Sequence, residues 1–350
     1  MKIINQLLLL CLLALGVPSA MGQVEIHEWT NKGGRTIRAK FVSGDAETVT
    51  IFTKGSNFTI KLADLGPESQ ALARKLTVPP STNANSPKPS AAPRSSVTKK
   101  GPLPTIRVAE SDWGGASLRD IGKILNSSAE QLWPHASQDR LDTIIVDRST
   151  SGPIVLFRRG NEKQYLVRLN THKTFWSQYA FQFAHEFGHI MFGYKAGDQT
   201  NQWFEESLCE AASLFALRRM SDAWKTAPPY PNWKSYGPSF RKYAQDRIDE
   251  HPWPKPKSIA AWYRENAKAL AENATDRKKN TTVATQLLPL FEKNPKRWAA
   301  TAYLNIRKTN KTRDFTTYLT DWRNACPAKD KPFAIKIAGL FGMKLPAERR

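Results

Sequence analysis

The sequence predicts an α+β fold whose parts are separated along the chain, and three observations lead to this prediction. Residues 24–76 alternate apolar and polar side chains with a period of two, interrupted by turn residues, as in a small antiparallel sheet. Residues 78–104 contain seven prolines and four basic residues but no acidic one, a composition typical of a flexible linker. From residue 105 onward, short strand-like runs come first, and helical periodicity follows to the end of the chain.

The first folded segment is predicted to be a small antiparallel β-barrel covering residues 23–77. Its turn residues lie at Asn31–Gly34 and at Lys54–Asn57, and Gly and Asn are residues that tight turns favour. Between the turns, one face of each run is apolar, because the apolar side chains recur at every second position. These positions are Ile37, Ala39 and Phe41, then Val49 and Ile51, then Phe58, Ile60 and Leu62. Such a sheet buries its apolar face by closing, or nearly closing, on itself.

This segment also carries several short motifs of a known family. They are Glu28-Trp29-Thr30, Gly33-Gly34-Arg35, Ala39-Lys40-Phe41-Val42 and Leu62-Ala63-Asp64-Leu65. On these motifs the segment resembles the SLA homology domain (the SHD-type domain of endocytic adaptors) in its secreted bacterial form. The resemblance implies a compact binding module without chemistry of its own, and it leaves the ligand of the barrel unknown.

The first residues have the features of an export signal. Lys2 precedes the apolar run Leu7–Val17, and the small residues Ala20 and Gly22 stand where a signal peptidase cuts. The apolar run is too short to cross a bilayer comfortably, and no second long apolar stretch follows it. We therefore expect residues 1–22 to be a cleaved signal peptide. The protein is then exported, to the periplasm or the exterior, without a transmembrane anchor; an uncleaved anchor is the alternative.

The chain is strongly basic, since 52 Lys and Arg residues against 31 Asp and Glu residues give a formal charge of +21. Hydrophobic residues make up 40% of the chain, which is typical of a globular protein and excludes a disordered one. No aromatic and basic recognition motif accompanies the charge, so no specific nucleic-acid partner is expected for an exported protein. An acidic cell-surface polymer is a candidate partner, and a basic surface without a dedicated ligand is the alternative.

Residues 105–350 are predicted to form the second folded domain. Helical periodicity covers residues 117–132 and 174–192, and a further helix starts near Trp203. Beyond Ser239 the pattern is helical, with breaks at prolines. The predicted strands are Leu141–Asp147, Pro153–Arg158 and Gln164–Leu169, and the predicted helix breaks are Pro252–Pro254, Asn294-Pro295 and Pro327.

The most informative motif is the pentapeptide His185-Glu186-Phe187-Gly188-His189. Histidines four positions apart lie one turn apart on the same helical face, so both imidazoles can reach one metal ion. Glu186 is turned toward the neighbouring edge of the helix, where it can act as a general base on a water molecule at the ion. Polar groups on a helix rich in core aromatics are costly unless something pairs with them. The motif therefore predicts a zinc site, and two satisfied core histidines are the alternative.

Catalytic zinc usually takes three protein ligands, so a third ligand is needed. The segment Trp203-Phe204-Glu205-Glu206-Ser207-Leu208-Cys209-Glu210 lies downstream and offers three glutamates. With the two-histidine helix, it resembles the gluzincin metallopeptidases, whose second metal helix reads Trp-hydrophobic-x-Glu-small-hydrophobic-x-Glu. The resemblance spans residues 105–220 and implies a zincin-like domain. In it Glu206 is the third ligand and Glu210 bonds a ligating histidine from outside; Glu205 and Glu210 remain alternative ligands.

The resemblance also implies a function, that of an exported zinc metallopeptidase. It would hydrolyse peptide bonds of a protein or peptide substrate by means of a water molecule that zinc binds and Glu186 activates. In this family an antiparallel edge strand before the metal helix holds extended peptide, and Gln164–Leu169 occupies that place; a covered strand is the alternative. An oxyanion-stabilising donor is expected beyond residue 225, and the unranked candidates are Tyr230, Tyr236, Tyr243 and His251. A non-catalytic adaptor acting through the N-terminal barrel is the alternative function.

Two cysteines, Cys209 and Cys326, remain once the signal is removed. In an oxidising compartment they can form one disulfide, and two buried free thiols are the alternative. Helical spacing puts Cys209 on the stripe next to Glu206, so we expect its sulfur not to ligate the metal.

Overall fold

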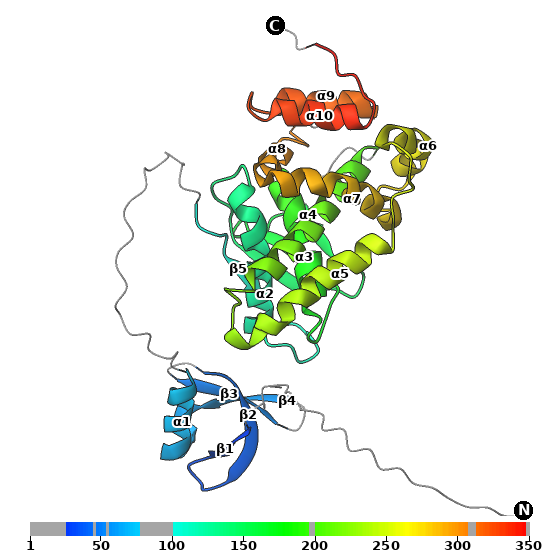
Figure 1. Ribbon diagram of the computed structural model, residues 1–350. Helices are drawn as coiled ribbons and strands as arrows, with labels where there is room; N and C mark the ends of the chain where they lie inside the picture. Colours follow the sequence, from blue (N-terminus) through cyan, green and yellow to red (C-terminus); the bar gives the residue numbers. More distant parts are fainter. Residues whose placement is uncertain are drawn as a thin grey trace, which may run out of the picture. The chain divides into compact units, whose positions relative to one another are not determined.

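The computed structural model describes residues 26–44, 47–53, 56–77, 101–195, 200–306 and 313–347. The chain divides into two compact units, Met1–Ser95 and Ser96–Arg350, and the α+β class is confirmed (Figure 1). The boundary between the units falls inside the predicted linker, 78–104. The predicted signal peptide, 1–22, and the linker up to residue 100 lie outside the described residues.

The N-terminal unit contains a four-stranded antiparallel sheet with its strands in chain order. The strands are β1 (Ile26–Thr30), β2 (Thr36–Gly44), β3 (Thr48–Thr53) and β4 (Ser56–Lys61). Trp29 pairs with Ile37 and Ile51 with Phe58, so the predicted strands and the turn at Asn31–Gly34 are confirmed, whereas Lys54 and Gly55 of the second turn lie outside the described residues. Among the described residues β1 and β4 are the two edge strands and no closed barrel is seen, so closure of the barrel stays a prediction.

A short helix, which was not predicted, covers the apolar face of this sheet. After the 3₁₀ turn η1 (Leu62–Asp64), helix α1 (Pro67–Thr77) begins with its proline at the first position, where no backbone N–H is needed. Ala73 is buried in the same cluster as Trp29 and Ile51. The helix thus supplies the cover that the sheet needs.

The C-terminal unit begins with a mixed four-stranded sheet in the order β5-β6-β8-β7. Its strands are β5 (Ile106–Val108), β6 (Ile144–Arg148), β7 (Ile154–Leu156) and β8 (Tyr165–Leu169). β7 and β8 lie within predicted strand regions, β6 overlaps the third and ends one residue beyond it, and β5 was not predicted. β5, β6 and β8 run parallel, and β7 runs antiparallel to β8.

Of the two alternatives for Gln164–Leu169, an exposed edge strand and a covered strand, the edge strand is not observed. β8 lies between β6 and β7 and is paired on both sides. The antiparallel edge strand is instead β7, whose Val155 is paired with Val167 of β8. The alternation in β8 shows which of its side chains are buried but not whether the strand lies at an edge. An internal strand with one exposed face has the same pattern.

The rest of the C-terminal unit is helical, as predicted. The helices are α2 (Leu118–Leu132), α3 (Trp176–Met191), α4 (Gln202–Ala223), α5 (Gly237–Asp249), α6 (Ile259–Glu272), α7 (Arg277–Lys293), α8 (Trp298–Thr301), α9 (Phe315–Ala325) and α10 (Lys331–Leu340). The predicted proline breaks separate α5 from α6, end α7 and follow α9. No helix among the described residues is long and apolar enough to cross a membrane.

Helices α3 and α4 form the centre of this unit. They pack against each other, with α2 against both and with α5 and α7 against α4 (Figure 1). Both are buried on almost every side, so their polar residues lie inside the apolar core. The buried polar residues on these two helices are Ser177, His185, Glu186, His189, Glu205, Ser207, Glu210, Ser213 and Ser221. This concentration of titratable groups in a core marks the candidate site.

Candidate metal centre

The two histidines of the pentapeptide lie next to each other inside the protein, as their spacing predicted. His185 and His189 are 8% and 5% exposed, and their ring centroids are 5.2 Å apart on α3. A buried imidazole requires a partner for each ring nitrogen, because an unpaired polar atom in a core destabilises the fold. Carboxylates of α4 lie at all four ring nitrogens, two of them at hydrogen-bond distance.

Glu206 on α4 faces both histidines with its two carboxylate oxygens. Its Oε2 lies 3.1 Å from Nε2 of His185, and its Oε1 lies 3.6 Å from Nε2 of His189. Gln202, one turn earlier on the same helix, donates to Oε1 at 3.4 Å. The two Nε2 atoms therefore converge on one carboxylate, and the structure brings together the three residues predicted as ligands.

The other two glutamates of α4 lie at the outer nitrogens of the imidazoles. Glu205 accepts a hydrogen bond from Nδ1 of His189 at 2.7 Å. Glu210 lies 3.7 Å from Nδ1 of His185, a distance too long for a hydrogen bond. Thr281 donates to Glu210 at 2.7 Å and holds its carboxylate in place. Glu205 and Glu210 thus face away from the point where the two Nε2 atoms converge, unlike Glu206.

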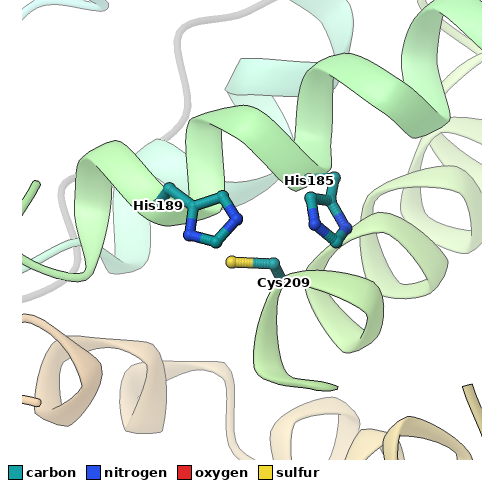
Figure 2. A group of neighbouring side chains, drawn as sticks. All are labelled: His185, His189 and Cys209. Carbon is teal, nitrogen blue, oxygen red and sulfur yellow. The ribbon is translucent and has the colours of Figure 1, made fainter. Parts of the chain in front are cut away.

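Cys209 lies closer to the histidines than the helical stripe suggested. One ligand atom each from His185, His189 and Cys209 lie within 4.8 Å of one another, and all three residues are buried, so this group could hold a metal ion. Figure 2 shows the two rings on one helix and the cysteine reaching toward them from the next. Cys209 approaches because α4 crosses α3 at Gly188, which has no side chain there. Burial and the surrounding carboxylates raise the pKa of the Cys209 thiol, which keeps it protonated without a metal.

Glu186 lies beside the histidines but toward the sheet. It is 3% exposed and accepts a hydrogen bond from the backbone N–H of Val155 in β7. Burial raises the pKa of Glu186, and the nearby imidazoles of His185 and His189 only partly offset this effect. A carboxylate with a raised pKa accepts a proton more readily than an ordinary one, as a general base must.

The imidazoles and the carboxylates of the site shift each other's pKa values. Burial alone would lower the pKa of His185, but the carboxylates of Glu206, Glu210 and Glu186 raise it to about 10. Burial alone would raise the pKa of Glu206, but the hydrogen bond with His185 and the charges of both imidazoles lower it to about 2. The negative charge of the buried glutamates is therefore stabilised by positive charge between them and the imidazoles. Either protons or a metal ion can supply that positive charge.

The donor atoms present fit a zinc ion. Imidazole nitrogen, carboxylate oxygen and thiol sulfur are the atoms that zinc binds in proteins, and all three kinds converge here. The carboxylate of Glu205 behind His189 is the kind of outer partner that fixes a ligating imidazole.

Among the described residues, none of the four candidates for oxyanion stabilisation makes a hydrogen bond with His185, His189 or Glu206. Tyr236 makes a hydrogen bond with the hydroxyl of Ser177 at 3.2 Å, and burial together with Asp120 raises the pKa of Tyr230 to about 12. Burial also raises the pKa of Tyr243, which feels the charges of Arg247 and Glu210. His251 follows α5 in a turn.

Two residues around the histidines carry no signal in the sequence. Phe157 follows the edge strand β7, is 42% exposed, and sets its ring edge-on to His189 with centroids 6.1 Å apart. Asn305 follows α8 and donates to Oε2 of Glu205. Both are far from His189 in the sequence, and neither belongs to a motif.

Both cysteines are free and buried, so the disulfide between Cys209 and Cys326 is not formed. Cys326 instead directs its sulfur to the carbonyl oxygen of Ala300 at 3.8 Å. The structure thus agrees with the alternative of two free thiols.

Comparison with known proteins adds no assignment to this site. No family model, no curated protein and no solved structure matches the chain.

Proposed function

We propose that the unit Ser96–Arg350 is a zinc-dependent metallopeptidase. One observation carries the proposal: both Nε2 atoms, from His185 and His189, face the single carboxylate of Glu206 within the core. Polar side chains are placed in a core at a cost in stability, so a convergent set of this kind is more typical of a metal site than of packing.

In this proposal His185, His189 and Glu206 hold the zinc ion. Glu205 orients the imidazole of His189 by accepting from its Nδ1, and Glu210 places its negative charge 3.7 Å from Nδ1 of His185. When bound, zinc acts as a Lewis acid that polarises the peptide carbonyl and makes water a better nucleophile at neutral pH. Cys209 keeps its protonated thiol beside the site and is not needed as a ligand.

Glu186 serves as the general base in this proposal. Its carboxylate takes a proton from the attacking water and delivers it to the nitrogen of the leaving amine. Two features of the site favour this role: the side chain is buried beside the histidines, and its pKa is raised. The edge strand β7 lies next to Glu186, through the backbone of Val155, and offers main-chain groups to an extended substrate.

In this proposal the protein is exported, and its substrate is a protein or a peptide. The N-terminal unit would then act as a binding module for a ligand that remains to be identified. The formal charge of +21 suits an acidic cell-surface polymer as an additional partner.

Metal analysis of the purified protein, together with digestion of a peptide library, tests this function. We expect about one zinc per chain and hydrolysis that a chelator abolishes. Glu186→Gln should keep the zinc and abolish hydrolysis, since the base does not ligate the metal. The matched control is Glu272→Gln, on the exposed face of α6, which should leave both unchanged.

The outcomes separate the candidate functions. If the Glu186→Gln variant hydrolysed peptides as fast as the wild type, the proposed mechanism would be ruled out. Loss of zinc in that variant would make Glu186 a ligand. A wild-type protein with neither zinc nor hydrolysis would favour the non-catalytic adaptor acting through the N-terminal unit.

A further inference from the structure

A chain of buried hydrogen bonds links the metal centre to the C-terminal helices. Nδ1 of His189 donates to Oε1 of Glu205 at 2.7 Å, and Asn305 donates its side-chain N–H to Oε2 of the same carboxylate. The hydroxyl of Tyr318, on α9, donates to Oδ1 of Asn305 at 3.0 Å. All four side chains are at least nine-tenths buried.

The chemistry of these groups fixes the direction of every hydrogen bond. A carboxylate oxygen accepts hydrogen bonds, so His189 and Asn305 both donate to Glu205. The amide of Asn305 therefore turns its N–H₂ to the carboxylate, which leaves its oxygen to accept from Tyr318. As a consequence Nδ1 of His189 carries the proton, and Nε2 keeps its lone pair for a metal.

The two proposed histidine ligands differ in whether their outer nitrogen, Nδ1, has a hydrogen-bond partner. Nδ1 of His185 has no hydrogen-bond partner among the described residues, and Glu210 is 3.7 Å away. His189 is instead held by a continuous series of groups from three separate elements. Its ring is therefore the one whose tautomer and orientation the fold fixes most firmly.

The far end of the series is anchored by packing. The ring of Tyr318 lies near Phe204 and Phe315, and the guanidinium of Arg313 lies 5.2 Å from its centroid. Arg313 in turn pairs with Asp321 at 2.8 Å, on the same helix as Tyr318. The hydroxyl of Tyr318 is thus presented to Asn305 from a rigid position.

We infer that Asn305 and Tyr318 are positioning residues that set the affinity of the centre for zinc by orienting Glu205 and, through it, His189. The inference rests on the proposed metal site. It makes the C-terminal helices part of that site, although none of their side chains is among the proposed ligands.

Zinc affinity of the full-length protein, measured by competition with a chelator, tests the inference. Asn305→Ala should weaken zinc binding about 10-fold, as loss of an outer partner does. Tyr318→Phe removes one hydroxyl and keeps the ring, so a smaller loss of about 3- to 5-fold is expected. Both losses should disappear in a Glu205→Gln background, because the effect passes through that carboxylate.

Tyr303→Phe is the matched control. Its hydroxyl makes a hydrogen bond of the same kind, 3.0 Å long, with Ser137, and that bond is not connected to Glu205. The control should leave zinc affinity unchanged. A shift in the visible spectrum of the cobalt-substituted Tyr318→Phe protein, absent in Tyr303→Phe, would report a changed ligand orientation that a purely structural role would not produce.

Two results would overturn the inference, and they are distinguishable. If the wild type binds zinc and Tyr318→Phe binds it equally well, the series does not act on the centre, while the proposed function stands. If the wild type binds no zinc, the proposed function fails and the inference fails with it. Should Asn305→Ala fail to fold, Tyr318→Phe still decides between these outcomes.

Discussion

Cys209 packs its sulfur directly against Gly188, at the point where α4 crosses the histidine helix α3. A Cβ atom on Gly188 would lie 3.1 Å from Sγ of Cys209 and 3.4 Å from its Cα. The contact with Sγ is tighter than ordinary van der Waals distance, and the contact with the backbone Cα is at its lower limit. The absence of a side chain at Gly188 therefore brings the residues of α4 within reach of both imidazoles.

Gly188→Ala should destabilise the protein by about 1–3 kcal/mol, as overpacking of a core does, and should weaken zinc binding. Chemical unfolding of the metal-free protein and zinc competition measure the two effects. Gly122→Ala, on α2, is the control, since a Cβ there meets nothing within 4 Å and alanine favours a helix. A Gly188→Ala protein as stable as the Gly122→Ala protein would contradict the close crossing.

Cys209→Ala should retain zinc, because Glu206 already faces both Nε2 atoms. Metal content and the absorption of the cobalt-substituted protein are the measurements, since a sulfur ligand gives a charge-transfer band. Cys326→Ala, which alters the other buried free thiol, is the control. Loss of metal in the Cys209→Ala protein alone would identify the thiol as a ligand.

Glu206→Ala should lower the zinc content sharply, whereas Glu210→Ala should weaken affinity or activity about 10- to 100-fold. The reason is that Glu206 faces the inner nitrogens and Glu210 lies at an outer one. Metal analysis of both variants at equal protein concentration checks this. Reversed phenotypes would make Glu210 the ligand and leave the class of enzyme unchanged.

The metal-free protein should receive the full stabilisation of its imidazole–carboxylate pairs within a limited pH window. The pKa of His185 is raised to about 10, so its contribution is full below its unfolded pKa of 6.5 and is lost as pH rises through 10. The pKa of Glu206 is lowered to about 2, so its contribution is full above 4.5 and is lost as pH falls through 2. Thermal unfolding of chelator-treated protein should therefore show both contributions between pH 4.5 and 6.5. Glu206→Gln should flatten the acid side of that profile.

Limited proteolysis should cut within residues 78–104 and release two folded fragments, the larger of which carries all the zinc. The two units have separate cores, and a proline-rich segment without acidic residues has little to protect it. Mass spectrometry locates the cuts, and metal analysis follows the zinc. Resistance of this segment to several proteases would contradict its assignment as a linker.

Several features of the fold could be predicted because they depend on neighbours along the chain. Alternation identified β2, β3 and β4, and prolines identified the ends of α5, α7 and α9. Helix α1 was not predicted, because most of its residues are polar. Its side chains Leu72, Ala73 and Leu76 pack on the sheet, but their helical spacing is hard to recognise among the polar residues. The place of β8 inside its sheet could not be predicted either, because strand order depends on long-range pairing.

The sequence by itself determined that His185 and His189 share one helical face with Glu186 beside them, because the turn of a helix fixes residues four apart. Only the tertiary structure decided that Glu206 faces the inner nitrogens, that Glu205 bonds His189 from outside, and that Cys209 lies near both rings. These relations depend on where α4 crosses α3, and that crossing is set by packing around Gly188. The link from Tyr318 through Asn305 to Glu205 joins residues more than a hundred positions apart in the chain, and no local periodicity records such contacts.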